Sequence, residues 1–303
     1  MSQTRPLVCY VSDIFREHDP GRHPERPARI DAVMQAVRAA DAPVEEARAA
    51  SQDDLERVHP PAFLAAIREL CEAGGGAIDL DTVVSERSYD AAVVASGAAT
   101  AAVDAVLAGD VGAAFCLGRP PGHHAEAARA MGFCLVNHAA VAAAHARAAG
   151  VERVAVLDWD AHHGNGTQAI FWGDPAVLYV SLHQYPFYPG TGGRAERGGG
   201  AGEGATVNIP LAAGTSEREF TDAFESEALP ALRSFDPGLL IVSAGFDAHR
   251  EDPLCDLGLS SAAFGDLARA VREVGAGPVL ILEGGYDLRA LFESVSEVVA
   301  ALA

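Results

Sequence analysis

The segment VLDWDAHHGNGT (156–167) places two acids and two histidines within six residues, directly after an apolar run. Alternate side chains of an extended segment point to the same side, so Asp160 and His162 can bind one ion together. A carboxylate and an imidazole, with a further ligand and an open position for water, are typical of a catalytic Zn²⁺ site. Taken alone, the pair also fits a hydrogen-bonded contact at a strand end.

Four other apolar runs are followed by residues that can do chemistry. The runs and the segments after them are 112–117 before GRPPGHH, 176–182 before HQYPFYPG, 238–244 before GFDAH and 278–282 before EGGYD. Asp247 is the natural third metal ligand, because it also follows an apolar run. The adjacent His123 and His124 can divide general-base and general-acid work, since imidazole titrates near neutrality. The Tyr286 hydroxyl can donate to a developing oxyanion.

These residues depend on elements that bring the ends of the runs together. The runs alternate with helical patterns at about 27–37, 88–108, 138–149, 216–234 and 261–274. Strand–helix alternation with fully apolar strands predicts an α/β fold, in which helices cover both faces of a mainly parallel central sheet. Ligand sites of such sheets form beyond the carboxyl ends of the strands, where the five segments would meet. We expect a single-domain, three-layer α/β/α arrangement over residues 1–303.

The composition restricts the classes of function. The 42 acidic and 22 basic residues give a formal net charge of −20, which argues against a nucleic-acid partner, since phosphate binding relies on clustered basic residues. The five cysteines include no C-x-x-C pair, which is typical of reduced thiols in a cytoplasmic protein. The N-terminus lacks a signal-peptide pattern, and the stretch 91–109 carries Asp104, so we expect no membrane partner. No oligomeric state is indicated.

Six segments together resemble the zinc-dependent histone deacetylase family. HPERPARI (23–30) is similar to the N-terminal segment of its class II and bacterial amidohydrolase branch. The other five are RPPGHHAEAARAMGFCLVNHAAVAAA, VAVLDWDAHHGNGTQAIF, YVSLHQYPFYPGTG, SAGFDAHREDPLCDLGLS and LEGGYDL. They follow the family order between about residues 18 and 290, and five collinear motifs are far more specific than one. The resemblance implies an arginase/deacetylase-like fold and removal of acetyl or other short acyl groups from acylated lysine or acylated small amines.

The resemblance also implies roles for single residues. The implied ligands of one Zn²⁺ per chain are Asp160, His162 and Asp247. The implied catalytic residues are His123, His124, Tyr286, Asp158 and Asn165. Asp158 would orient His123. Asn165 stands behind His124, where some members carry an aspartate, and this exchange should alter the basicity of His124.

The resemblance further implies a substrate channel and a structural cation. The implied channel residues are Gly132, Phe133, Tyr188 and Leu254. Leu254 stands where the polyamine-specialised member carries an acidic gatekeeper, so leucine resembles the lysine-deacetylase state. A structural K⁺ is implied at the side chains of Asp158, Asp160 and Ser181 and the main-chain carbonyls of His162 and Leu182.

Three alternatives compete with this interpretation. An arginase-like enzyme of the same fold would use two metals, and its motifs resemble D-A-H-x-D and S-x-D-x-D-x-x-D-P. In this sequence Gly164 stands at the last aspartate of the first motif, and His249 stands at the middle aspartate of the second. A single zinc is therefore favoured. The substrate could be an acetylpolyamine or a small acylated metabolite. The chain could also be a pseudoenzyme that binds acylated ligands, although the intact histidine pair, ligand set and Tyr286 argue against it.

Overall fold

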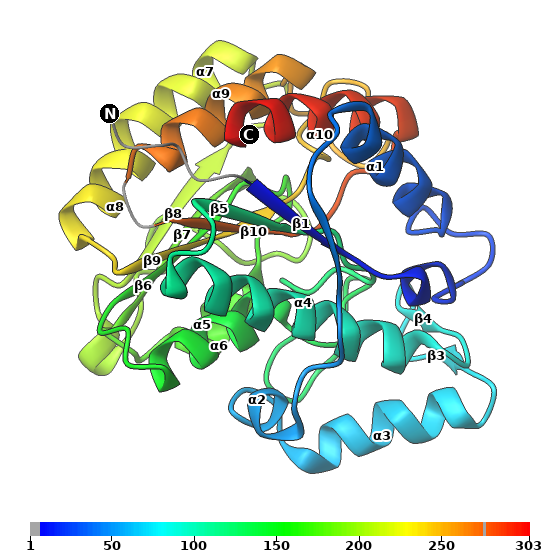
Figure 1. Cartoon of the computed structure of the whole chain (residues 1–303). Coiled ribbons are helices and arrows are strands. Elements are labelled where there is room, and N and C mark those ends of the chain that lie inside the picture. Colours follow the sequence, from blue (N-terminus) through cyan, green and yellow to red (C-terminus); the bar gives the residue numbers. More distant parts are fainter. Residues whose placement is uncertain (1–6, 275–276) are drawn as a thin grey trace.

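The computed structural model describes residues 7–274 and 277–303. Within them, a central sheet of eight parallel strands has the order β2-β1-β5-β10-β9-β6-β7-β8 (Figure 1). The strands are β1 (Leu7–Val11), β2 (Val44–Glu46), β5 (Ala113–Cys116), β6 (Val154–Asp158), β7 (Val177–Gln184), β8 (Thr206–Leu211), β9 (Leu239–Ala244) and β10 (Pro278–Leu282). A separate antiparallel pair joins β3 (Gly76–Ala77) to β4 (Val83–Val84).

Helices cover both faces of the sheet (Figure 1). One layer contains α4 (Ser88–Ala108), α5 (His138–Ala148) and α6 (Asn165–Phe171), with α2 (Gln52–Glu56) and α3 (Pro61–Glu72) packed outside it. The other contains α1 (Ala28–Ala39), α7 (Glu217–Ala223), α8 (Leu229–Phe235), α9 (Ser261–Arg272) and α10 (Leu288–Leu302). The predicted three-layer α/β/α class with a parallel sheet is therefore confirmed.

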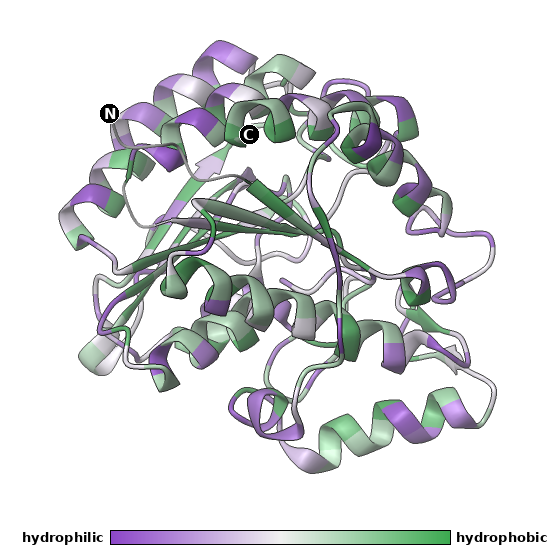
Figure 2. Ribbon diagram, in the orientation of Figure 1, coloured by the Kyte–Doolittle hydropathy of each residue, from purple (hydrophilic) through white to green (hydrophobic). Residues whose placement is uncertain are grey.

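The strands other than the two at the edges are mostly apolar, and both of their faces are buried under a helical layer (Figure 2). Successive side chains of a strand point to opposite faces. In β10, Leu280 and Leu282 pack toward α1, α9 and α10, whereas Val279 and Ile281 pack toward α4 and α5. The two cores therefore hold the sheet rigidly, and its strand ends can serve as a fixed platform for a site.

The predicted elements differ from the structure in a few places. The sequence pattern does not predict β2 and β8, which are the two edge strands: β2 is short and exposed, and β8 contains Pro210, which is tolerated at an edge. The single helix expected at 216–234 is interrupted by a π-helical turn at Phe224–Ala228, just before Pro230, which lacks an N–H for the regular ladder.

The alanine-rich helix α4 is long and apolar enough to cross a membrane by length and composition alone. More than half of its apolar window is buried inside the fold, where it packs on α5 and β5. Its small side chains allow this close approach, which is the arrangement of a core helix.

Candidate active site

The five chemically equipped segments meet at the carboxyl edge of the sheet. Asp158 is the last residue of β6, and its Cα partners on the neighbouring strands are Ser181 of β7 and Ser243 of β9. The loops that follow β5, β6, β7, β9 and β10 therefore start side by side. This topology places residues far apart in the chain around one centre.

Asp160, His162 and Asp247 form a cluster at this edge. One ligand atom from each lies within 4.8 Å of the others. The Nδ1 atom of His162 is 2.8 Å from Oδ2 of Asp247 and 3.2 Å from Oδ1 of Asp160. Two glycines back the carboxylates: a Cβ on Gly245 would lie 2.1 Å from Oδ2 of Asp160, and one on Gly284 would lie 2.5 Å from Oδ2 of Asp247. The backbone is thus shaped around these two acids.

The cluster fits a divalent cation. Both carboxylates are buried, and burial together with the neighbouring Asp160 raises the pKa of Asp247 to about 7. Two adjacent buried carboxylates repel each other when both are ionised. A divalent cation bound between them would stabilise the ionised pair. Two carboxylate oxygens and one imidazole nitrogen also suit Zn²⁺.

The tandem histidines lie beside this cluster, with ring centroids 4.0 Å apart. Nδ1 of His123 is 3.0 Å from Oδ2 of Asp158, and its Nε2 lies 3.7 Å from Oδ1 of Asp160. Burial opposes a charge on His123, but the carboxylates of Asp160 and Asp158 outweigh burial and raise its pKa well above the usual value. The two carboxylates thus favour the charged form of the His123 imidazole.

The surroundings of His124 favour its neutral form instead. Burial and the charge of His123 lower the pKa of His124 well below its usual value. Asn165 donates through Nδ2 to Oε1 of Glu126 at 3.0 Å, so its Oδ1 faces Nδ1 of His124 at 2.9 Å as an acceptor. This arrangement puts the proton of His124 on Nδ1 and leaves the lone pair of Nε2 free.

A cavity of about 140 Å³ leads to the cluster. Its lining residues are Asp81, Pro121, His123, His124, Gly132, Phe133, His162, Tyr188, Leu254 and Tyr286. All four predicted channel residues thus line the same space as the histidine pair and Tyr286. Gly132 has φ +58°, and a Cβ there would lie 2.5 Å from Cδ2 of His124. Only glycine therefore fits against the histidine at this point.

Aromatic rings form the walls of the channel. The Phe133 and Tyr286 rings meet edge to face at 5.8 Å between centroids, and those of His124 and Tyr188 at 5.1 Å. Tyr286 is buried and its backbone N–H donates to Oδ2 of Asp252 at 2.7 Å. A narrow channel walled by aromatic rings, which is also lined by three histidines, suits an alkyl chain that carries a polar head.

Arg29 and Glu283 are site residues that the sequence reasoning missed. Arg29 is fully buried, and it donates to the carbonyl oxygens of Gly285 at 2.7 Å and Glu283 at 2.5 Å. Glu283 is also fully buried, and it accepts the backbone N–H of Gly122, in the loop that carries His123 and His124. Both residues lie within the motifs HPERPARI and LEGGYDL. Glu283 could have been found from the sequence, because it is a charged residue that directly follows the apolar run 278–282.

The structure also bears on the two-metal alternative. A Cβ on Gly164 would lie 2.3 Å from Oδ2 of Asp158 and 3.1 Å from Nδ1 of His123, so an aspartate there would disrupt that pair. His249 turns away from the cluster: its Nε2 lies 3.1 Å from Oγ of Ser261, and its Nδ1 accepts the N–H of Glu251. The single-metal interpretation is favoured.

Comparison with known proteins agrees with this geometry. The family model described as "Histone deacetylase domain" matches residues 23–302. The chain belongs to the histone deacetylase family. It is 45% identical over 78% of its length to a histone deacetylase-like amidohydrolase of Pseudomonas aeruginosa and 40% identical over 92% to histone deacetylase 15 of Arabidopsis thaliana. It spans 64% and 52% of the lengths of these relatives.

One similar solved structure is named for acetylpolyamines, not for histones. The crystal structure of an acetylpolyamine aminohydrolase from Burkholderia pseudomallei matches with a TM-score of 0.91 and 33% identity, and the match covers 98% of each chain. The predicted family membership and fold are thus confirmed, while the family includes proteins named for different acetylated amines.

Proposed function

We propose that this protein is a zinc-dependent amidohydrolase that removes acetyl or another short acyl group from N-acylated lysine-like amines. The observation that carries the proposal is the position of the His124 imidazole in the channel. Its free Nε2 faces the channel that also holds His162 and Tyr286. A neutral imidazole aimed at a confined site beside a metal-binding cluster is equipped to activate water for attack on an amide.

The side chains divide the work of hydrolysis between them. Asp160, His162 and Asp247 would hold the zinc, which when bound polarises the amide carbonyl and makes its water more acidic. His124 takes the proton of the attacking water at Nε2. The Tyr286 hydroxyl donates to the oxygen of the carbonyl as its negative charge develops. His123, hydrogen-bonded to Asp158, faces the same centre, and a positive charge on its imidazole would stabilise the oxyanion. As the C–N bond breaks, the histidine pair returns a proton to the leaving nitrogen, so the products are a carboxylate and a free amine.

The structural monovalent cation belongs to this proposal as well. We place K⁺ at Asp158, Asp160 and Ser181 with the carbonyls of His162 and Leu182. The register that pairs Asp158 with Ser181 across β6 and β7 supports it. Oxygen-only donors of this kind suit a hard cation. If the proposal is right, turnover in Na⁺- and K⁺-free buffer rises when K⁺ is added; unchanged turnover contradicts it.

The second candidate substrate class is the acetylpolyamines. The solved relative named as an acetylpolyamine aminohydrolase favours it, whereas Leu254 at the channel favours acyl-lysine because it offers no charge to a second amine.

A turnover screen tests both candidates. Acetate release is measured with acyl-lysine peptides of increasing acyl length, N-acetylated polyamines and small acetylamines, with His124→Ala as the inactive control. We expect acetyl-lysine to give the highest kcat/KM. Zinc binding without turnover of any substrate would contradict the proposed function and indicate a pseudoenzyme.

A further inference from the structure

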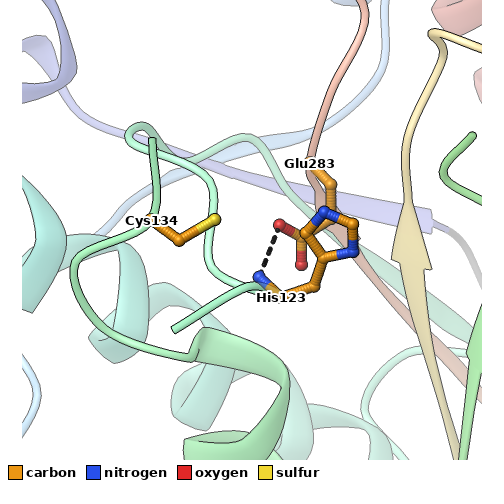
Figure 3. A group of neighbouring side chains, drawn as sticks. All are labelled: His123, Cys134 and Glu283. Atoms are coloured by element: carbon orange, nitrogen blue, oxygen red, sulfur yellow. Dashed lines mark hydrogen bonds between the residues drawn. The ribbon is translucent and has the colours of Figure 1, made fainter. Parts of the chain in front are cut away.

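A carboxylate beneath the tandem histidines has no part in the chemistry described above. Glu283 directly follows β10 and is fully buried. Its Oε2 accepts two consecutive backbone N–H groups of the loop after β5, from Gly122 at 2.6 Å and from His123 at 3.1 Å. Figure 3 shows the second of these bonds, from the backbone N–H of His123 to the Glu283 carboxylate. The other oxygen, Oε1, accepts the hydroxyl of Ser243 at 3.1 Å.

The loop needs such an acceptor because of its sequence. Pro120 and Pro121 have no N–H, so Gly122 and His123 supply the first free donors after Arg119. Both donors are buried, and buried N–H groups require partners. Two successive N–H groups that converge on one point form a concavity suited to an anion. Glu283 provides the acceptor oxygen from the end of the neighbouring strand β10.

The same three residues also have the composition of a metal site. Ligand atoms of His123, Cys134 and Glu283 lie within 4.8 Å of one another (Figure 3). However, Nδ1 of His123 is bonded to Asp158, and its Nε2 faces Asp160. The Cys134 thiol donates to the carbonyl of Gly132, and burial raises its pKa well above the usual value. A neutral thiol and an occupied imidazole favour a positioning role over metal binding.

We propose that Glu283 is a positioning residue for the catalytic histidines, and this inference rests on the proposed function. By holding the main chain of Gly122 and His123, Glu283 fixes the point from which both imidazoles project. It acts through the backbone and does not touch the substrate. A small displacement of catalytic groups can lower the rate about 100-fold. Loss of the two backbone hydrogen bonds to Glu283 should therefore lower kcat.

The test uses two substitutions and a matched control in the zinc-loaded protein. Glu283→Gln keeps one oxygen that can accept both N–H groups, whereas Glu283→Ala removes it. Glu219→Ala is the control, because Glu219 also accepts a backbone N–H, that of Ser216 at 2.9 Å, but lies on the exposed start of α7. Steady-state kinetics with acetyl-lysine peptide is combined with amide hydrogen exchange of the segment 119–125.

We expect Glu283→Ala to lower kcat by about 10- to 100-fold with little change in KM, and to speed exchange at Gly122 and His123. Glu283→Gln should stay within a few-fold of wild type in both measurements, and Glu219→Ala should match wild type. Wild-type kcat in Glu283→Ala, or unchanged exchange at the two amides, would overturn the proposal. An inactive wild type would count against the proposed function. Hydrogen exchange does not require turnover, so it would still test whether Glu283 holds the main chain of Gly122 and His123.

Discussion

The guanidinium carbon of Arg29 lies 5.0 Å from the centroid of the Tyr286 ring, and Arg29 also binds the carbonyls of Glu283 and Gly285 that precede this tyrosine. Arg29 therefore holds both the ring and the main chain of Tyr286. Its charge is balanced by buried Glu25, whose carboxylate lies 3.1 Å from Nη1.

Replacing Arg29 should weaken both catalysis and the fold. Arg29→Met removes the hydrogen bonds that hold the main chain before Tyr286, so we expect a lower kcat. It also removes one partner of buried Glu25, so we expect the free energy of unfolding to fall by about 3 kcal/mol. Arg29→Lys keeps the charge without the planar fork and should be intermediate. Steady-state kinetics and denaturant unfolding measure the two effects. A Met variant with unaltered kcat would show that Arg29 does not position Tyr286.

Tyr286→Phe should lower kcat by about 10²–10³-fold, the scale for removing one donor to a developing oxyanion. The phenyl ring keeps the contact with Phe133 and the backbone bond to Asp252, so zinc content and melting temperature should hardly change. Zinc analysis, melting curves and single-turnover rates check this together. Wild-type turnover in the Phe variant would mean that another group stabilises the oxyanion.

The stability of the protein should depend on pH through His145. Burial opposes a charge on His145, but its contacts with Asp104 at 2.8 Å and Asp54 at 2.9 Å raise its pKa. A pKa above the unfolded value of about 6.5 means that the stabilisation is complete below that pH and is lost as the pH rises through the folded value.

The unfolding free energies of wild type and His145→Gln measure this effect. We expect the difference between the two proteins to be larger at about pH 5.5 than at about pH 9. A difference independent of pH would indicate that His145 is not charged in the folded protein.

Leu254 should influence the choice of substrate. The net charge of −20 attracts any cationic substrate, so discrimination must come from the channel, where a partly desolvated charge pair is worth more than one in water. We expect wild type to prefer acetyl-lysine peptides over N-acetylated polyamines and Leu254→Glu to shift the ratio of kcat/KM values toward polyamines. Leu254→Gln controls for size and polarity. A wild-type preference for acetylpolyamine, measured at moderate salt, would refute this expectation.

The sequence predicted the parts of the site that depend on side chains at strand ends. Asp160, His162, Asp247 and Tyr286 each follow an apolar run, and parallel strands bring those positions together for topological reasons. Arg29 belongs to a different case, because it acts on main-chain carbonyls of a segment more than 250 residues away. A sequence pattern shows that such a residue is charged, but it does not show which backbone group receives its hydrogen bond.

The central claim is that one ion held by Asp160, His162 and Asp247 supports amide hydrolysis at this site. The most direct measurement is a zinc titration of chelated, metal-free protein, with acetate release from an acetyl-lysine peptide as the readout and Asp247→Ala as the control. We predict that activity rises in proportion to added zinc and reaches its plateau at one equivalent, and that the control stays inactive. Hydrolysis by the metal-free protein, or a plateau that requires two equivalents, would contradict the claim.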